Sequence, residues 1–210
     1  MPRPAALPLL AVLLLPGVAA AQSAAGGTET FGPWLLTCFQ DRMTDTAECR
    51  MLHRQPVEPA APGHAALALE VVDRGGRLVP AVTARDLTLE GAARGVLAVT
   101  GTAQLRFPPN RFYDMPCTLE GRSLVCAPRD ADLARAATEL PAADRALVRI
   151  TGLLVPEAQA MREPVEIRVS DTGPALARFR SRVPAGSAPP PPPGFDVREM
   201  LGRLLRLLQG

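Results

Sequence analysis

Four cysteines carry the clearest chemical signal in the sequence, and they fall into two close pairs: Cys38 with Cys49, and Cys117 with Cys126. An even number of cysteines is typical of disulfide-bonded proteins in oxidising compartments. Four cysteines allow three connectivities, and we predict the local one, in which each bond closes a short loop between two strands. A four-cysteine zinc site would need C-x₂₋₄-C spacing, which neither pair has. The sequence therefore predicts two disulfides, no metal site and no cofactor.

The two histidines are the remaining candidates for catalysis. His53 lies at the end of a predicted strand and His64 in a Pro-rich loop. A Ser-His-Asp set can be written from Ser123, His53 and Asp73, but nothing in the sequence orients the three side chains. The sequence has no nucleophile elbow, phosphate loop or dinucleotide fingerprint. We predict no catalytic residues; the alternative is a periplasmic hydrolase with its site near His53 or His64.

The single tryptophan, Trp34, could stack on a ligand, but a lone tryptophan beside a disulfide is more typical of core packing. The chain has 210 residues, of which 47% are hydrophobic and 21% charged, as expected for a globular domain. Its formal net charge is only +2 and its aromatic content is low. We therefore expect no nucleic-acid partner.

The first residues predict the compartment. Arg3 is followed by an apolar run over residues 5–18 and by the small residues Ala19, Ala20 and Ala21. This is the layout of a cleavable signal peptide, which we place at residues 1–21. The apolar run is shorter than the ~20 residues that span a bilayer. We predict a periplasmic or otherwise exported bacterial protein with no transmembrane segment in the mature chain.

The domain that must position these residues is predicted to be mainly β, a β-sandwich-like unit over residues 31–183 with one or two short helices. Residues 22–30 are expected to form a flexible N-terminus, and residues 56–64 a Pro-rich loop. Alternating apolar residues and turn signals predict short strands, which favours a sandwich over a βαβ fold. The expected strands cover residues 34–38, 47–53, 65–72, 78–83, 87–89, 95–100, 103–107, 122–127, 145–155 and 165–169, and the expected helices residues 130–140 and 172–179.

The tail has a different pattern. Residues 184–194 form a Pro-rich linker whose five consecutive prolines favour an extended spacer. Residues 195–210 then predict an amphipathic helix. Its apolar stripe is a candidate binding site for an unknown envelope protein or for self-association, with packing onto its own domain or a lipid surface as the alternatives. The stripe consists of Val197, Met200, Leu201, Leu204, Leu205 and Leu208.

One stretch near the N-terminus carries a family resemblance. The pattern Phe31-Gly32-x-Trp34-x-x-x-Cys38, followed by Cys49-x-x-Leu52, resembles the opening of invasion-associated locus B family proteins. The order of the later segments is also similar, so the resemblance covers roughly residues 31–182. Pro33 departs from the pattern, since the family usually has an acidic or polar residue there.

The resemblance implies a periplasmic or surface-exposed β-sandwich with no established enzymatic activity. We therefore expect an exported, non-enzymatic cell-envelope protein that binds a protein or an envelope component. A role in host invasion does not follow, because many relatives belong to non-pathogenic bacteria.

Overall fold

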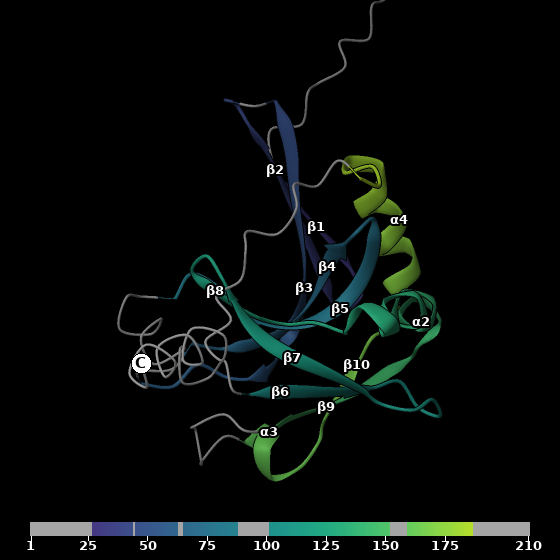
Figure 1. Ribbon diagram of the computed structural model, residues 1–210. Helices are drawn as coiled ribbons and strands as arrows, with labels where there is room; N and C mark the ends of the chain where they lie inside the picture. Colours follow the sequence, from purple (N-terminus) through teal and green to yellow (C-terminus); the bar gives the residue numbers. More distant parts are fainter. Residues whose placement is uncertain (1–26, 44, 63–64, 88–100, 152–158, 187–210) are drawn as a thin grey trace, which may run out of the picture.

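The computed structural model describes residues 27–43, 45–62, 65–87, 101–151 and 159–186, and these residues form ten antiparallel strands with short helices (Figure 1). The mainly β expectation is confirmed. The strands are β1 (Thr28–Phe31), β2 (Trp34–Asp41), β3 (Thr46–Glu58), β4 (Leu67–Arg74), β5 (Arg77–Ala84), β6 (Thr102–Arg106), β7 (Tyr113–Glu120), β8 (Ser123–Cys126), β9 (Arg145–Thr151) and β10 (Val165–Arg168). The α-helices are α2 (Leu133–Glu139), α3 (Gln159–Arg162) and α4 (Thr172–Arg182), and the 3₁₀ turns Asp130–Asp132 and Leu140–Ala142 flank α2. None of the described helices is long and apolar enough to cross a membrane.

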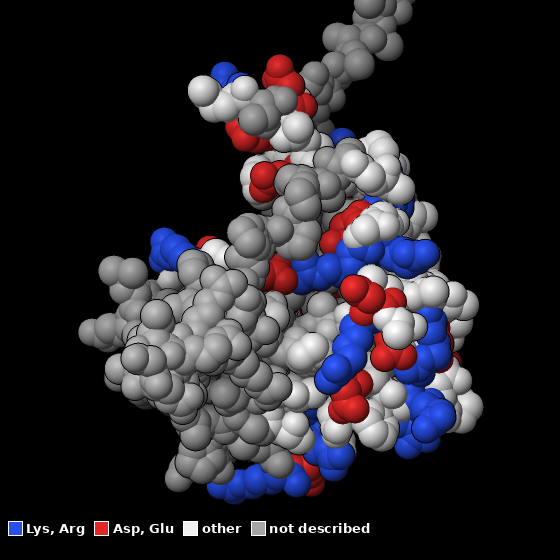
Figure 2. Space-filling view, viewed as in Figure 1, with Lys and Arg blue, Asp and Glu red and all other residues white. Residues whose placement is uncertain are grey.

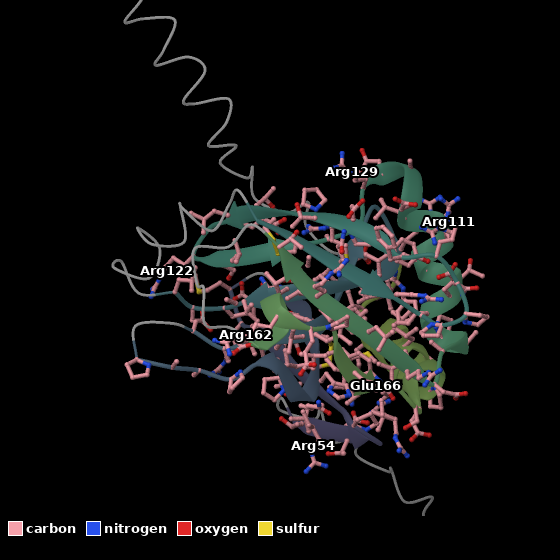
Figure 3. All side chains as sticks on the ribbon, turned by 90° about the horizontal axis from the view of Figure 1, so that it is seen from below. Arg54, Arg111, Arg122, Arg129, Arg162 and Glu166 are labelled. Atoms are coloured by element: carbon pink, nitrogen blue, oxygen red, sulfur yellow. A yellow bond between two sulfur atoms is a disulfide. The ribbon has the colours of Figure 1, made fainter. Side chains whose placement is uncertain are left out.

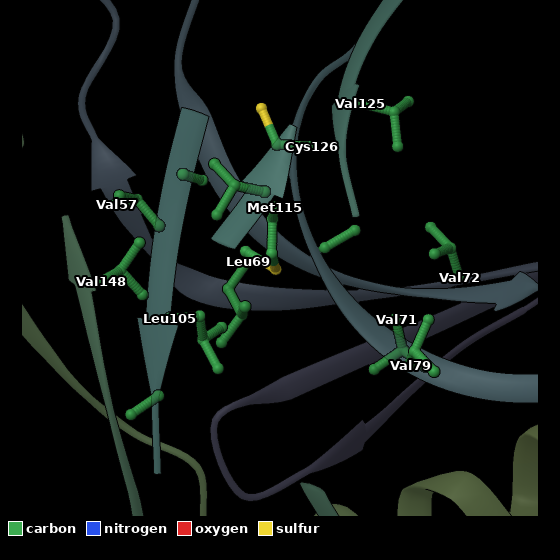
Figure 4. Close-up of a cluster of buried hydrophobic side chains, with 14 of the residues drawn as sticks. Val57, Leu69, Val71, Val72, Val79, Leu105, Met115, Val125, Cys126 and Val148 are labelled. Atoms are coloured by element: carbon green, nitrogen blue, oxygen red, sulfur yellow. The ribbon is translucent and has the colours of Figure 1, made fainter. Parts of the chain in front are cut away.

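The ten strands form one continuous sheet in the order β1-β2-β3-β4-β5-β8-β7-β6-β9-β10. Most neighbours are joined by hairpins, and their alternating side chains give the sheet a buried face. On β9, for example, Ala146, Val148 and Ile150 are buried while Arg145 and Arg149 are exposed. Figure 4 shows apolar side chains from several strands meeting in this core.

The sheet curves so far that its last strand returns to β3. The His53 ring donates from Nε2 to the carbonyl oxygen of Arg168, at 2.8 Å. Gln55 donates from Nε2 to the carbonyl oxygen of Glu166, at 3.3 Å. Both acceptors lie on β10, so side chains of β3 cover the edge of β10 that has no strand partner. Covered edges of this kind protect a sheet from pairing with other chains.

Several strands differ from the sequence prediction: β7 lies outside the expected strand ranges, and β2 continues past residue 38 to Asp41. Residues 28–31 form β1, although residues 28–30 were expected within the flexible N-terminus. The strand pairs with β2, and its Glu29 carboxylate receives three hydrogen bonds from Arg178 on α4. β3 continues to Glu58, through Pro56, which was expected in the loop. The register between β3 and β4 shifts on both sides of Pro56. A proline is tolerated at such a bulge because no ladder hydrogen bond needs its missing N–H.

Helix α4 is fixed to the sheet by a short chain of hydrogen bonds. Trp34 donates from Nε1 to the Thr172 hydroxyl at 2.9 Å, and that hydroxyl donates to the carbonyl oxygen of Val169 at 2.5 Å. Further along the helix, Arg180 pairs with Asp73 at 2.6 Å. The start and the end of α4 are therefore tied to different parts of the sheet.

The contact between β1 and α4 predicts a pH dependence of stability. The hydrogen bonds from Arg178, together with the charge of Arg178 and Arg182, hold the pKa of the Glu29 carboxyl below its ordinary value. A carboxyl whose pKa is lower in the folded state stabilises the fold above its unfolded pKa, and this stabilisation disappears as the pH falls through the folded pKa. We expect the melting temperature of the wild type to fall more steeply below about pH 4 than that of Glu29→Gln. Thermal unfolding between pH 7 and pH 3 checks this, with Glu166→Gln as the control for an exposed glutamate. Parallel curves for wild type and Glu29→Gln would contradict it.

Candidate functional site

The hairpin of β2 and β3 extends beyond the strands on either side of it. β1 pairs with β2 only over Trp34–Thr37, and the pairing of β4 with β3 begins at Met51. Residues 38–43 and 45–49, here called the arm, therefore form a paired hairpin without a further strand beside it among the described residues. Figure 1 shows the arm projecting from the body at the top of the view.

A disulfide closes the base of the arm. Cys38 and Cys49 are directly opposite each other in the register, with their Cα atoms 4.1 Å apart, and their sulfurs are bonded. Cys117 and Cys126 are bonded across β7 and β8 in the same way. Both predicted pairings are confirmed. The first bond is half-buried and the second is buried in the core. The arm disulfide holds two strands in register where the rest of the sheet no longer supports them.

One face of the arm combines an aromatic ring with carboxylates. Phe39 is 46% exposed and lies directly opposite Glu48, with Asp41 two residues further on the same face. Met43, in the turn at the tip, is 93% exposed. The arm contains three acidic residues and only one arginine, Arg42, so its net charge is negative. Figure 2 shows red side chains gathered at this projecting end.

Local hydrogen bonds shape the tip. The Asp41 carboxylate accepts from the backbone N–H of Met43 at 2.8 Å, which is an Asx turn. Gln40 donates from its side chain to the carbonyl oxygen of Asp45, whose φ of 54° is one that aspartate tolerates better than most residues. The tip that carries Met43 is thus shaped by bonds of its own.

The histidine candidates do not form a catalytic set. His53 is 3% exposed. Its Nε2 donates to the carbonyl oxygen of Arg168, and its Nδ1 accepts from the backbone N–H of Gln55 at 3.1 Å. Asp73 bonds Arg180 and the N–H of Gly76 instead of the histidine. The arrangement of His53 with Asp73 and Ser123 is therefore not assembled, because both ring nitrogens of His53 bond the backbone. His64 lies outside the described residues.

Trp34 is a core residue in the structure. Its side chain is completely buried, and the edge of its ring system meets His53 with 5.1 Å between centroids and an 87° interplanar angle. A ligand in solution has no access to this ring. The core-packing interpretation is confirmed.

Two buried polar clusters are satisfied by the protein itself. Glu70, 2% exposed, accepts from the Thr83 hydroxyl at 2.6 Å and from two nitrogens of Arg85 at 2.9 and 3.0 Å. Tyr113 donates to Glu139 from beneath the guanidinium of Arg135. Burial, together with the Glu139 carboxylate, raises the pKa of Tyr113 above its ordinary value. Neither cluster presents an unused group to a substrate.

The described residues contain no group of three His, Cys, Asp or Glu side chains that could hold a metal ion. The signal peptide, residues 88–100 and the tail stripe Val197, Met200, Leu201, Leu204, Leu205 and Leu208 lie outside the described part, so those expectations stay predictions. The expected strands over residues 34–38 and 47–53 leave Phe39 and Met43 between them without a predicted role. The sequence signal that could have indicated this site is the presence of two large apolar residues in an otherwise polar segment between Cys38 and Cys49.

The two disulfides indicate an oxidising, exported environment. The feature of the described surface that most clearly lacks a structural role is the arm, which combines exposed apolar side chains with carboxylates. Comparison of the chain with known protein families, with curated proteins and with solved structures finds no match.

Proposed function

We propose that this protein is an exported, non-enzymatic binding protein of the bacterial envelope, of the invasion-associated locus B type, and that the arm is its binding element. The observation that carries the proposal is the exposure of Phe39 and Met43 on a disulfide-closed hairpin that projects from the body. Periplasmic location after cleavage of residues 1–21 is part of the same proposal.

The physical argument concerns what the arm gains on binding. Full burial of a phenylalanine or methionine side chain contributes about 1.5–3 kcal/mol relative to exposure. Neither Phe39 nor Met43 obtains this within its own domain. The Cys38–Cys49 bond fixes the two strands before a partner arrives, which lowers the entropy lost on binding. The arm is thus suited to recognition, and beyond Cys38 and Cys49 at its base none of its apolar side chains is buried.

The non-enzymatic part of the proposal is supported by His53, whose two ring nitrogens bond backbone groups. It is also supported by the cysteines, all four of which are in disulfides and so cannot act as nucleophiles. Residues 195–210 are proposed to act as a second, tethered contact.

Site-specific photocrosslinking in intact cells of the producing bacterium tests the proposal. A photoreactive residue in place of Met43 should give a crosslinked adduct with a protein partner. The same residue in place of Arg77, which is also exposed but lies outside the arm, should give none. Adding Phe39→Ser to the Met43 variant should reduce the adduct at least tenfold. No adduct at position 43, or equal adducts at both positions, would refute the binding role of the arm.

A further inference from the structure

A second surface of the molecule has the opposite charge pattern. On the outer face of β6, β9 and β10, the half-buried Leu147 is bordered by exposed arginines. Arg106 is its register partner on β6, Glu166 is its register partner on β10, and Arg145 and Arg149 lie two residues away on either side along β9. Arg168 on β10 is directly opposite Arg145. Leu147 and these four arginines are here called the Arg face, and neighbouring members are about 5–7 Å apart.

The arginines of the Arg face are poorly neutralised by the protein. Arg149 donates to the side-chain oxygen of Gln104, and Arg106 donates to backbone carbonyls of the loop that follows β6; neither pairs with a carboxylate among the described residues. The guanidinium of Arg145 lies 3.8 Å from the carboxylate of Glu166, close to the upper distance limit for an ion pair. Arg168 faces Arg145, and like charges directly opposite on paired strands are destabilising.

This pattern contrasts with helix α4, where all three arginines have carboxylate partners, two of them at 2.8 Å or closer. An arginine cluster around an apolar residue fits a partner that brings carboxylates and an apolar side chain together.

The arm has that complementary arrangement. Phe39 lies between Glu48, its neighbour across the strands, and Asp41, its neighbour along the strand. The same spacings separate Leu147 from its arginines on the Arg face. Phe39 placed against Leu147, with Glu48 on the side of Arg106 and away from Glu166, therefore brings both carboxylates of the arm within reach of guanidinium groups.

The two surfaces of one molecule are at opposite ends. In Figure 1 the arm is at the top, and β6 and β9 are at the bottom. Figure 3 views the molecule from below and shows the side of β9 and β10 that carries Glu166 turned toward the viewer. The arm points away from this side, so it can meet only the Arg face of another molecule.

We propose that the arm binds the Arg face of a second copy of this chain. The inference rests on the proposed binding role of the arm. Each copy presents one arm and one Arg face, so the contact is head-to-tail and produces short open chains unless its rotation closes a ring. Because the contact joins opposite charges at an exposed surface, added salt weakens it.

The test is sedimentation of the purified exported protein with its disulfides intact, over a concentration series at low and high salt. The arm variant carries Phe39→Ser and Glu48→Gln. The face variant carries Arg149→Glu and Arg168→Glu. A charge-matched control carries Arg77→Glu and Arg129→Glu, two exposed arginines outside both surfaces. All six substituted side chains are exposed. Melting temperatures verify that every variant is folded.

We expect wild type and control to associate at low salt, and the arm and face variants each to associate at least tenfold more weakly. An equal mixture of the arm and face variants should form a one-to-one dimer and nothing larger, since the mixture retains one good arm and one good face. Deletion of residues 187–210 should leave association unchanged.

A monomeric wild type at all concentrations, a mixture that does not form dimers, or association that depends on residues 187–210 instead of the arm would each overturn the inference. A monomeric wild type whose position 43 still crosslinks to a different protein in cells overturns the self-association alone and leaves the proposed function standing.

Discussion

Replacing Trp34 by alanine is expected to lower the free energy of unfolding by about 3–5 kcal/mol, the range for large buried aromatic side chains. Trp34 is completely buried, and the cavity left by its ring would lie between β2, β3 and the start of α4. The substitution also removes the donor to the Thr172 hydroxyl, which is the link between β2 and α4. Both effects act on the same junction, so the loss should be among the largest for any single side chain.

Trp34→Phe separates the two effects, because it keeps much of the apolar volume and removes the donor. We expect it to lower stability by about 1–2 kcal/mol, the sum of one hydrogen bond and a partial cavity. Urea unfolding followed by far-UV circular dichroism measures both variants, since Trp34 is the only tryptophan and its fluorescence is lost. A loss below 1 kcal/mol for Trp34→Ala would show that this junction does not hold the fold together.

The local features of the fold could be predicted from the sequence because their causes are local. The two disulfides join positions close in sequence, and in each pair the intervening residues can turn the chain. The hairpin between β4 and β5 follows from Asp73 and Gly76, whose side-chain and backbone groups bond at 2.7 Å. Alternation alone locates β10, in which Ile167 is buried between the exposed Glu166 and Arg168.

The features that sequence reasoning missed depend on distant partners. β1 pairs with its neighbour β2, but the contact that ties it to α4, from Arg178 to Glu29, joins residues 149 positions apart in the chain. His53 looks like a free histidine in the sequence and becomes a bridge to β10 only when the sheet curves back to Arg168, 115 positions away. No local pattern contains either contact.

The arm illustrates the same limit at the candidate site. The pattern of apolar and polar residues around Phe39 is the same whether or not further strands lie beside the hairpin. Its exposure depends on where β1 and β4 stop pairing with the central hairpin. The Arg face is likewise assembled from Arg106, Arg149 and Arg168, which lie on three different strands. Both surfaces are therefore properties of the sheet topology.

Gly32→Ala is expected to lower the free energy of unfolding by about 2–4 kcal/mol, through backbone strain and a steric conflict together. Gly32 has a φ of 52°, in the left-handed region that costs an L-residue about 1–2 kcal/mol. A Cβ at this position would lie 2.3 Å from Oδ2 of Asp171 and 3.2 Å from its Cβ and Cγ. Rotation of the carboxylate relieves only the first of these contacts, since the Asp171 Cβ is fixed by a backbone that itself has a φ of 58°.

Gly121→Ala is the matched control, because Gly121 has a φ of 59° and nothing within 4 Å of an added Cβ. It should show the backbone contribution alone, about 1–2 kcal/mol. In an Asp171→Gly background, which removes the conflicting side chain, the effect of Gly32→Ala should fall to the same value. Urea unfolding of the four variants measures this double-mutant cycle. Equal destabilisation by Gly32→Ala and Gly121→Ala in the wild-type background would contradict this prediction. Backbone conformation alone would then explain the glycine at position 32, and the close approach of the turn after β1 to the start of α4 would contribute nothing.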